Sequence, residues 1–259
     1  MQLDSKRALI TGAGSGIGRA LAIAAAKRGM HVAICGRRLE ALEQTAAQLD
    51  TGRNISIIAA DVTSPCDRRR LFEKLAREWG ELDVLVNNAG VVPGGSFATI
   101  DDQTLEETLR VNIHAPIALA RDFLPLLEAA RPSRIVNIGS IFGDIAYPGF
   151  AAYSASKFAL RGFSDALRRE LASHGVSVTY AAPRATATVA ASAFYGVPGV
   201  SIERLDPPEH VAEAIWRAVA RDERSVYARG PESLFVLLQR VAPWLIDRSL
   251  TRRKSTSPL

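Results

Sequence analysis

Two ionisable side chains one helical turn apart are the first sign of chemistry in this sequence. Tyr153 and Lys157 are four residues apart in a stretch with helical periodicity, so both lie on one face of the predicted helix. A free tyrosine has a pKa of about 10 and is a poor base at neutral pH, but a nearby ammonium favours the phenolate and lowers that pKa. Tyr153 can then exchange a proton with a carbonyl or hydroxyl oxygen. Ser140, 13 residues earlier, supplies a hydroxyl that can hydrogen-bond the same oxygen.

A glycine-rich segment near the amino terminus predicts a site for an anion. Residues 11–18 read Thr-Gly-Ala-Gly-Ser-Gly-Ile-Gly, directly after an apolar run and directly before a helical pattern. Gly12 and Gly16 carry no side chain that would hold a pyrophosphate away, and Gly18 allows the helix to pack closely on a sheet. The helix directs its free N–H groups and positive dipole end toward the anion. The segment therefore predicts a dinucleotide cofactor, although some glycine clusters of this kind are only tight turns.

The end of the second predicted strand indicates which dinucleotide is bound. An acidic residue at this place accepts the ribose 2′-hydroxyl of NAD(H), whereas an arginine accommodates the 2′-phosphate of NADP(H). Gly36 stands where the acid is expected, and Arg37 and Arg38 follow with guanidinium donors that fit a phosphate. We therefore expect NADP(H) in preference to NAD(H). The alternative is that both arginines are solvated residues at the start of the next helix.

Short apolar runs rich in β-branched residues alternate with longer helical patterns along most of the chain. Strands are expected at 7–11, 31–35, 55–59, 82–86, 134–138, 176–181 and 225–228. Helices are expected at 17–28, 39–49, 67–79, 104–130, 152–173 and 208–221. Continuous apolar runs suit strands that are covered on both faces. The alternation predicts an α/β fold, namely a single-domain, Rossmann-type, doubly wound parallel sheet of about seven strands with helices on both faces.

The motifs occur together in the order of a known family. Asn87-Asn88-Ala89-Gly90 closes the fourth predicted strand, Ser140 follows the fifth, and Tyr153 and Lys157 lie on the next helix. With the glycine loop and Asn112, the sequence resembles the short-chain dehydrogenase/reductase superfamily from residue 5 to about residue 230. The resemblance implies an oxidoreductase that interconverts a ketone or aldehyde and an alcohol. It also implies that Lys157 binds the nicotinamide ribose, and that Asn112 holds a water that joins Lys157 to solvent.

The catalytic residues expected on these grounds are Asn112, Ser140, Tyr153 and Lys157. The resemblance also extends the cofactor site beyond the glycine loop and the two arginines, for instance to Asp61 and Val62, which resemble a pair that contacts adenine. The full set expected at the cofactor is Gly12, Ser15, Gly16, Ile17, Gly18, Arg37, Arg38, Asp61, Val62, Asn88, Ala89, Gly90, Tyr153, Lys157, Pro183, Thr186 and Thr188. Asn87 and Asn88 could instead serve mainly to tie strands together.

One position departs from the family pattern. Where the family has Pro-Gly after the sixth strand, this chain has Pro183 followed by Arg184. Arg184 could contact an anionic or polar group of the substrate, or it could point to solvent or pair with an acid. The resemblance makes 184–206 a lid over the substrate. Apolar residues between Ser140 and Tyr153 favour an apolar substrate, although apolar lining is common to most ligand sites.

Charge is concentrated at the carboxyl-terminal end. The chain of 259 residues has a formal net charge of +5, and 240–259 contains five basic residues and one acidic residue. The rest is nearly neutral, which argues against nucleic-acid binding. We therefore divide the chain into a catalytic domain, 1–230, and a basic, amphipathic, helical extension, 231–259. The extension could lie on an anionic membrane, but we expect it to pack against the main domain or a second subunit.

The remaining features bound the class of protein. No run of apolar residues is long enough to span a membrane, no signal-peptide pattern begins the chain, and two separate cysteines suit a reduced, cytoplasmic protein. No histidine and acid cluster has metal-ligand spacing, so we expect no metal. The family commonly forms dimers or tetramers through the helices that carry Asn112 and Tyr153. The alternatives to a reductase are an epimerase or dehydratase on the same scaffold, and a cofactor-binding regulator without turnover.

Overall fold

The computed structural model describes residues 1–49, 55–188, 193, 205–227 and 232–252. The strands are β1 (Arg7–Thr11), β2 (His31–Gly36), β3 (Ile55–Ala59), β4 (Val84–Asn87), β5 (Ser133–Ile138), β6 (Val176–Ala182) and β7 (Ser225–Tyr227). The α-helices are α1 (Gly16–Ala26), α2 (Leu39–Ala46), α3 (Pro65–Glu78), α4 (Asp102–Leu109), α5 (Ala115–Ala129), α6 (Ala151–Glu170), α7 (Pro208–Ala220), α8 (Glu232–Val241) and α9 (Pro243–Arg252). Most of the predicted lid, 189–192 and 194–204, lies outside the described residues.

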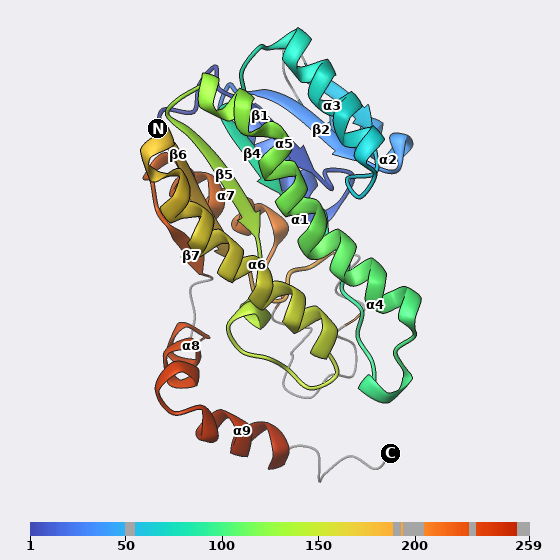
Figure 1. Ribbon diagram of the computed structural model, residues 1–259, viewed down its shortest axis with the longest axis vertical. Helices are drawn as coiled ribbons and strands as arrows, with labels where there is room; N and C mark the ends of the chain where they lie inside the picture. Colours follow the sequence, from blue (N-terminus) through green and yellow to red (C-terminus); the bar gives the residue numbers. More distant parts are fainter. Residues whose placement is uncertain (50–54, 189–192, 194–204, 228–231, 253–259) are drawn as a thin grey trace.

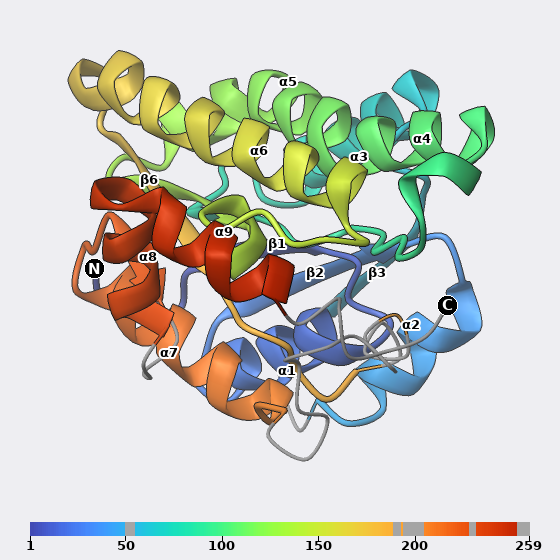
Figure 2. The same cartoon turned by 90° about the horizontal axis from the view of Figure 1, so that it is seen from below.

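The strands form a parallel sheet in the order β3-β2-β1-β4-β5-β6-β7 (Figure 1). Helices α3, α4, α5 and α6 lie on one side of it, and α1, α2 and α7 lie on the other (Figure 2). The predicted doubly wound α/β fold is therefore confirmed. Helices on both faces explain why the central strands are apolar throughout, since each strand has a face toward each helical layer.

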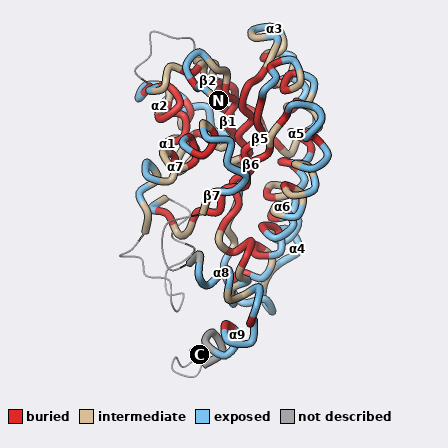
Figure 3. The backbone as a smooth tube through the Cα atoms, turned by 90° about the vertical axis from the view of Figure 1, so that its left-hand side faces the viewer, coloured by how far each residue is buried: buried red, intermediate tan, exposed pale blue. Residues whose placement is uncertain are grey.

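The core consists of two apolar clusters separated by the sheet. One joins the strands to α1 and α7, and the other joins them to α3 and α5. All residues of β4 and β5 are buried, and the burial of the central strands is visible in Figure 3. Trp216 of α7 is fully buried, and its indole N–H donates to the carbonyl of Leu21 in α1 at 3.0 Å. This bond fixes α7 against α1 without leaving a buried donor unpaired.

Most predicted boundaries differ from the observed ones by up to three residues, and two differences affect the candidate site or its approach. The strand expected to begin at Leu82 begins at Val84, where its pairing with Ala8 of β1 and Arg134 of β5 starts. Asp83, just before it, has a buried carboxylate that accepts from Lys6 and Arg7. The single helix expected over 104–130 is broken by a π-helical turn between α4 and α5. The extension forms α8 and α9, which meet just before Pro243, and no helix among the described residues is long and apolar enough to cross a membrane.

The parallel arrangement gathers the predicted functional segments at one edge of the sheet. The glycine loop follows β1, Asn88 follows β4, Ser140 follows β5 and Pro183 follows β6. The register aligns Ile10, Val86 and Val136 across three neighbouring strands, so their carboxyl ends lie at one level. The order of connection reverses between β1 and β4, where ligands bind in open α/β sheets.

Candidate active site

Tyr153, Lys157 and Ser140 form one buried cluster at this edge. Each has at most 8% of its surface exposed. A side-chain hydrogen bond joins the hydroxyls of Tyr153 and Ser140, and Lys157 Nζ lies 5.6 Å from the centre of the Tyr153 ring. Tyr153 and Lys157 both lie on the buried face of α6, as their four-residue spacing predicts. The structure thus brings a proton donor, a hydroxyl and an ammonium together.

The electrostatics of this cluster differ from the prediction that Lys157 lowers the pKa of Tyr153. Burial raises the pKa of Tyr153 to about 12, although the hydrogen bond from Ser140 opposes that rise. Burial also lowers the pKa of Lys157 to about 8, because the ammonium loses its hydration. Lys157 Nζ donates to the carbonyl of Ile138 at 3.0 Å, which holds it in place. At neutral pH the cluster therefore holds a protonated tyrosine beside an ammonium that is ready to lose its proton.

Asn112 lies in the π-helical turn Arg110–His114 between α4 and α5. Its amide bonds both backbone groups of Val91 at 2.9 Å and donates to Ser156 Oγ at 3.1 Å. Pro116 follows four residues later and has no N–H to bond the carbonyl of Asn112. This proline was the sequence signal for an interrupted helix, and π-helical turns often occur at functional sites.

Sequence reasoning missed a tyrosine that supports Ser140 from behind. Tyr180 of β6 is buried, and its hydroxyl donates to the carbonyl of Ser140 at 3.2 Å. A Cβ atom on Gly139 or Gly143 would collide with the Tyr180 side chain. The two glycines therefore leave the space that the tyrosine fills. The signal in the sequence was a pair of glycines on either side of Ser140, but their partner on another strand is visible only in the structure.

The glycine loop is shaped by close contacts with the end of β4. Gly12 has a φ of +66°, and a Cβ atom on it would lie 2.9 Å from Ala89 Cα. A Cβ on Gly18 would collide with the carbonyl of Gly12. Asn88 Nδ2 donates to the carbonyl of Thr11 at 2.9 Å, so this amide holds the loop in place. Gly12 therefore has no side chain because the end of β4 lies too close to it, and Gly18 has none because α1 lies too close to the glycine loop. A ligand that binds the loop would add to this requirement.

Neighbouring Asn87 has the strand-tying role that was left open. Its side chain donates to Asn137 Oδ1 at 2.9 Å and so connects β4 to β5.

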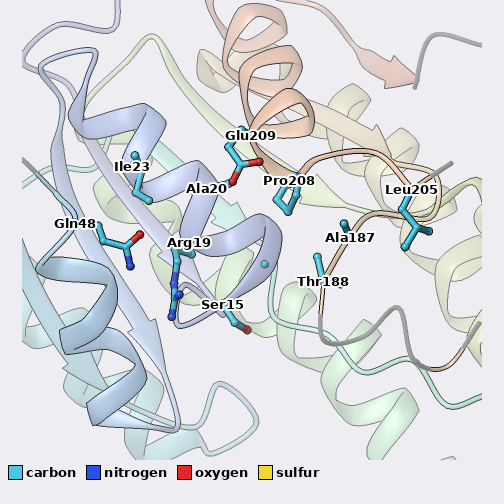
Figure 4. Close-up of a pocket in the computed structure, with 11 residues that line it drawn as sticks. Ser15, Arg19, Ala20, Ile23, Gln48, Ala187, Thr188, Leu205, Pro208 and Glu209 are labelled. Carbon is cyan, nitrogen blue, oxygen red and sulfur yellow. The ribbon is translucent and has the colours of Figure 1, made fainter. Parts of the chain in front are cut away.

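The start of α1 fits an anionic group. Ser15 precedes the helix in an extended conformation, its side chain makes no cap hydrogen bond, and the first turn contains no acidic residue. A cavity of about 490 Å³ adjoins this helix end and is lined by Ser15, Gly16 and Thr188 among others (Figure 4). A Cβ on Gly16 would lie 2.8 Å from Thr188 Cγ2. Backbone N–H groups without a side-chain cap, a glycine cradle and a hydroxyl suit the pyrophosphate of a dinucleotide.

The residues expected to choose between cofactors lie at the carboxyl ends of β2 and β3. Arg37 and Arg38 are exposed, and Arg37 Nη1 lies 3.5 Å from a carboxylate oxygen of Glu107. Burial alone would raise the pKa of Asp61, but hydrogen bonds from Thr63 and the charges of Arg37 and Arg110 outweigh it and keep that pKa below its ordinary value. Asp61 is therefore an anion that accepts hydrogen bonds.

The other predicted cofactor residues are spread along the same edge. Val62 is buried, Ile17 and Ala89 pack against the two core clusters, and a Cβ on Gly90 would lie 3.7 Å from Lys157 Nζ. After β6, the carbonyl of Pro183 accepts from Ile141 N at 3.0 Å. The buried Thr186 donates its hydroxyl to the carbonyl of Arg184 at 2.9 Å.

Arg184 pairs with an acid, which was one of the alternatives left open. Its guanidinium donates to both carboxylate oxygens of Asp206, at 2.8 and 2.7 Å. Asp206 also bonds the backbone of Ala185 and Ala187, and a bridge pairs it with Thr186. The residues at the two ends of the predicted lid are therefore joined to each other. Arg184 joins the ends of this segment in the place where the family has a glycine.

A small aromatic cluster adjoins Tyr153. Phe142, Phe150 and Tyr153 are buried together, and Phe142 stacks on Tyr147 with ring centres 5.3 Å apart. This cluster is separate from the two clusters of the main core. It gives the hydroxyls of Ser140 and Tyr153 an apolar environment, which strengthens their electrostatic interactions. Among the described residues, no group of three or more His, Cys, Asp or Glu could hold a metal ion.

Comparison with known proteins accounts for this arrangement. Residues 6–195 match the model of a family described as short chain dehydrogenase. The chain belongs to the short-chain dehydrogenase family. Bovine dehydrogenase/reductase SDR family member 7B is 31% identical to it over 260 aligned residues, which cover 95% of this chain and 80% of that protein. Like its relatives, this short-chain dehydrogenase is an oxidoreductase that acts on CH–OH or C=O groups.

Solved structures extend the likeness to the whole fold. A single-residue variant of actinorhodin polyketide ketoreductase with NADPH has a TM-score of 0.80 and 30% identity, and the match covers 89% of this chain and 98% of that one. A short-chain dehydrogenase/reductase from Burkholderia phymatum in complex with NAD has a TM-score of 0.85 and 25% identity, with 100% and 99% covered. Nicotinamide cofactors are therefore common to these relatives of the chain, and the two structures differ in which one they hold.

Proposed function

We propose that this short-chain dehydrogenase reduces an apolar ketone or aldehyde with NADPH, or oxidises the corresponding alcohol with NADP⁺. The observation that supports the reaction is the buried cluster of Tyr153, Ser140 and Lys157 at the carboxyl edge of the sheet. A protonated phenol, a second hydroxyl and a buried ammonium are the groups needed to polarise and protonate a carbonyl oxygen.

A bound nicotinamide supplies the hydride that is added to the carbonyl carbon. In reduction, the hydroxyls of Ser140 and Tyr153 hydrogen-bond the substrate oxygen, and Tyr153 gives its phenolic proton to that oxygen as the C=O bond becomes C–OH. The ammonium of Lys157 stabilises the phenolate that is left. Lys157 then returns a proton to Tyr153 and is itself reprotonated from solvent. In this proposal Asn112 belongs to the same relay, and the bonds of its amide to Val91 and Ser156 hold it in place.

Replacing the phenol tests this assignment. Tyr153→Phe should lower kcat by at least about a thousandfold, because the proton donor is gone, and should leave NADPH binding within about threefold. Tyr227→Phe is the matched control, since Tyr227 bonds Asp144 rather than the cluster. A Tyr153→Phe variant that keeps near-wild-type kcat would refute the role. Failure of wild-type protein to turn over any carbonyl substrate while binding NADPH would instead indicate a cofactor-binding regulator.

The preference for NADP(H) is supported by Arg37 and Arg38. Both are exposed after β2, and Gly36 provides no carboxylate to accept a ribose hydroxyl. The kcat/KM of wild-type protein should be higher with NADPH than with NADH. Arg37→Ala/Arg38→Ala should lower kcat/KM for NADPH by at least about tenfold, and by less than about twofold for NADH. Equal losses with both cofactors would contradict a 2′-phosphate contact.

The substrate class is proposed from the aromatic cluster around Tyr153. Ketones, aldehydes and 3-oxoacyl thioesters of increasing chain length form a suitable panel, with NADPH consumption as the signal. For an apolar pocket, kcat/KM should rise with each added methylene by up to about fourfold. A preference for small polar carbonyl compounds such as sugars would contradict an apolar site.

Self-association and location are further proposals. Leu105, Leu109, Ile117 and Phe158 are large apolar residues that are more than one third exposed on α4, α5 and α6. Asn112 lies between α4 and α5, and α6 carries Tyr153, so we propose that a dimer or tetramer forms through these helices. A monomer by light scattering would contradict this. Cys35 and Cys66 are free thiols, which supports a reducing compartment such as the cytoplasm.

A further inference from the structure

The carboxyl-terminal helices expose an apolar face. Leu234, Phe235, Leu237 and Val241 of α8, with Trp244 and Leu245 of α9, are between 46% and 70% exposed. Leu234, Leu237 and Val241 are spaced three and four residues apart, so they form one stripe along α8. Figure 3 shows both helices as largely exposed, beyond the main body of the protein. Monomeric proteins rarely leave so many adjacent large apolar side chains in water without a partner.

The opposite face of α8 holds the helix to the catalytic domain. Val236 is buried, and Arg240, one turn later, places Nη2 3.4 Å from Oδ1 of Asp144. Only 1% of the Asp144 side chain is exposed. Its carboxylate also pairs with Arg161 of α6 and accepts from the Tyr227 hydroxyl of β7 at 3.2 Å. This acid therefore connects α8 to two elements of the domain, and the apolar stripe is directed away from it.

Two partners could cover the apolar face of α8 and α9, namely a second copy of this chain or an anionic surface, and the charge of the segment distinguishes between them. The segment 232–259, which contains both helices, has five basic and two acidic residues and a net charge of +3, while the rest of the chain is nearly neutral. A second copy would pack the same face on itself, because two-fold interfaces are self-complementary, and would bring two +3 segments together. An anionic surface instead attracts them. Trp244 and Arg248 are both exposed and one turn apart, and tryptophan beside arginine is typical of segments at the membrane–water boundary.

We propose that the apolar face of α8 and α9 binds the surface of an anionic lipid membrane. Each helix has ten residues and is about 15 Å long, half of the hydrocarbon thickness, so both lie in the interface rather than cross it. Asp144, which anchors α8, is four residues from Ser140, and both helices lie beyond the carboxyl ends of β5 and β6 (Figure 1). Docking therefore turns the edge of the sheet that carries Ser140 toward the lipid, and its use for an apolar carbonyl substrate rests on the proposed function.

Vesicle binding by the full-length protein tests the proposal. Wild-type protein should co-sediment with vesicles of phosphatidylcholine and phosphatidylserine at least about tenfold more strongly than with phosphatidylcholine alone, and salt should weaken the binding. Leu237→Glu/Trp244→Glu should lower the partition coefficient at least about tenfold. The change places two carboxylates on an exposed surface and should leave the melting temperature unchanged. Leu39→Glu, at an exposed leucine on α2, is the matched control and should bind as wild type does.

Tryptophan fluorescence reports which face makes the contact. Trp216 is buried and Trp244 is 63% exposed, so vesicles should shift the emission of Trp244 to shorter wavelength. Trp244→Phe should still bind while most of this shift disappears. Absence of binding to anionic vesicles at low salt would overturn the proposal, as would unchanged binding by the double variant. Light scattering that shows a dimer in wild type and a monomer in the double variant would also overturn it, because a second copy would then be the occupant.

Discussion

A buried ammonium at the active site should destabilise the fold, and replacing Lys157 by methionine should show it. Lys157 is 5% exposed, and its pKa lies near 8 instead of 10.5 because of burial alone. Methionine has a similar length and no charge, so Lys157→Met removes the desolvation cost. It also leaves the carbonyl of Ile138 without its donor, at a cost of about 1 to 3 kcal/mol that is independent of pH.

The magnitude follows from the shift in pKa. One pKa unit corresponds to about 1.4 kcal/mol, so keeping Lys157 charged in the folded protein at pH 7 costs about 3 kcal/mol of unfolding free energy. Below pH 8 both states carry the proton and the cost is complete. Between pH 8 and 10.5 the folded protein releases its proton first, so the unfolded state binds more protons and stability rises with pH. Above 10.5 the cost disappears.

Urea unfolding of the cofactor-free protein at pH 7 and pH 10 measures this effect. The unfolding free energy of wild type, relative to Lys157→Met, should rise by about 2 to 3 kcal/mol between the two pH values. Lys27→Met, at an exposed lysine after α1, should shift stability equally at both. The test compares the unfolding free energies of wild type and Lys157→Met at each pH. If their difference is the same at both pH values within about 0.5 kcal/mol, the buried charge of Lys157 is not costly. Lys157→Met should also be inactive, which would link the cost to function.

Three further outcomes follow from the contacts of the site. Gly139→Ala should lower the unfolding free energy by about 1 to 3 kcal/mol and lower kcat, because the added Cβ collides with Tyr180. In a Tyr180→Val background the same change should lower the unfolding free energy by less than about 0.5 kcal/mol. Equal losses in both backgrounds would contradict the contact. The rate of carbonyl reduction should be level below pH 8 and fall above it as Lys157 loses its charge, whereas a level profile from pH 7 to 10 would contradict that role. Asp206→Asn should raise the KM of the carbonyl substrate by about threefold or more and change urea stability by less than about 1 kcal/mol, because the partly buried bond to Arg184 joins the ends of one segment and is not part of the core. An unchanged KM would contradict this role of the bond.

Much of the fold was predictable because its signals are local. Strands buried on both faces need continuous apolar runs, and helices that pack on the sheet need apolar residues three and four positions apart. Both patterns can therefore be recognised in the sequence. The π-helical turn at Asn112 was not predicted, although Pro116 was a local signal for it. The start of β4 was misplaced because pairing with Ala8 of β1 and Arg134 of β5 decides where the strand begins, and both residues are far from Val84 in the chain.

The sequence by itself determined the order of the elements, the glycine loop and the pairing of Tyr153 with Lys157 on one helical face, since each depends on residues close together in the chain. The tertiary structure alone decided the direction in which the pKa of Tyr153 is shifted, because burial by distant elements raises it more than the hydrogen bond from Ser140 lowers it. It also decided that Tyr180 supports Ser140 and that Arg184 pairs with Asp206. These contacts join separate strands and loops, and only the folded chain determines which side chains meet and how much water is excluded between them.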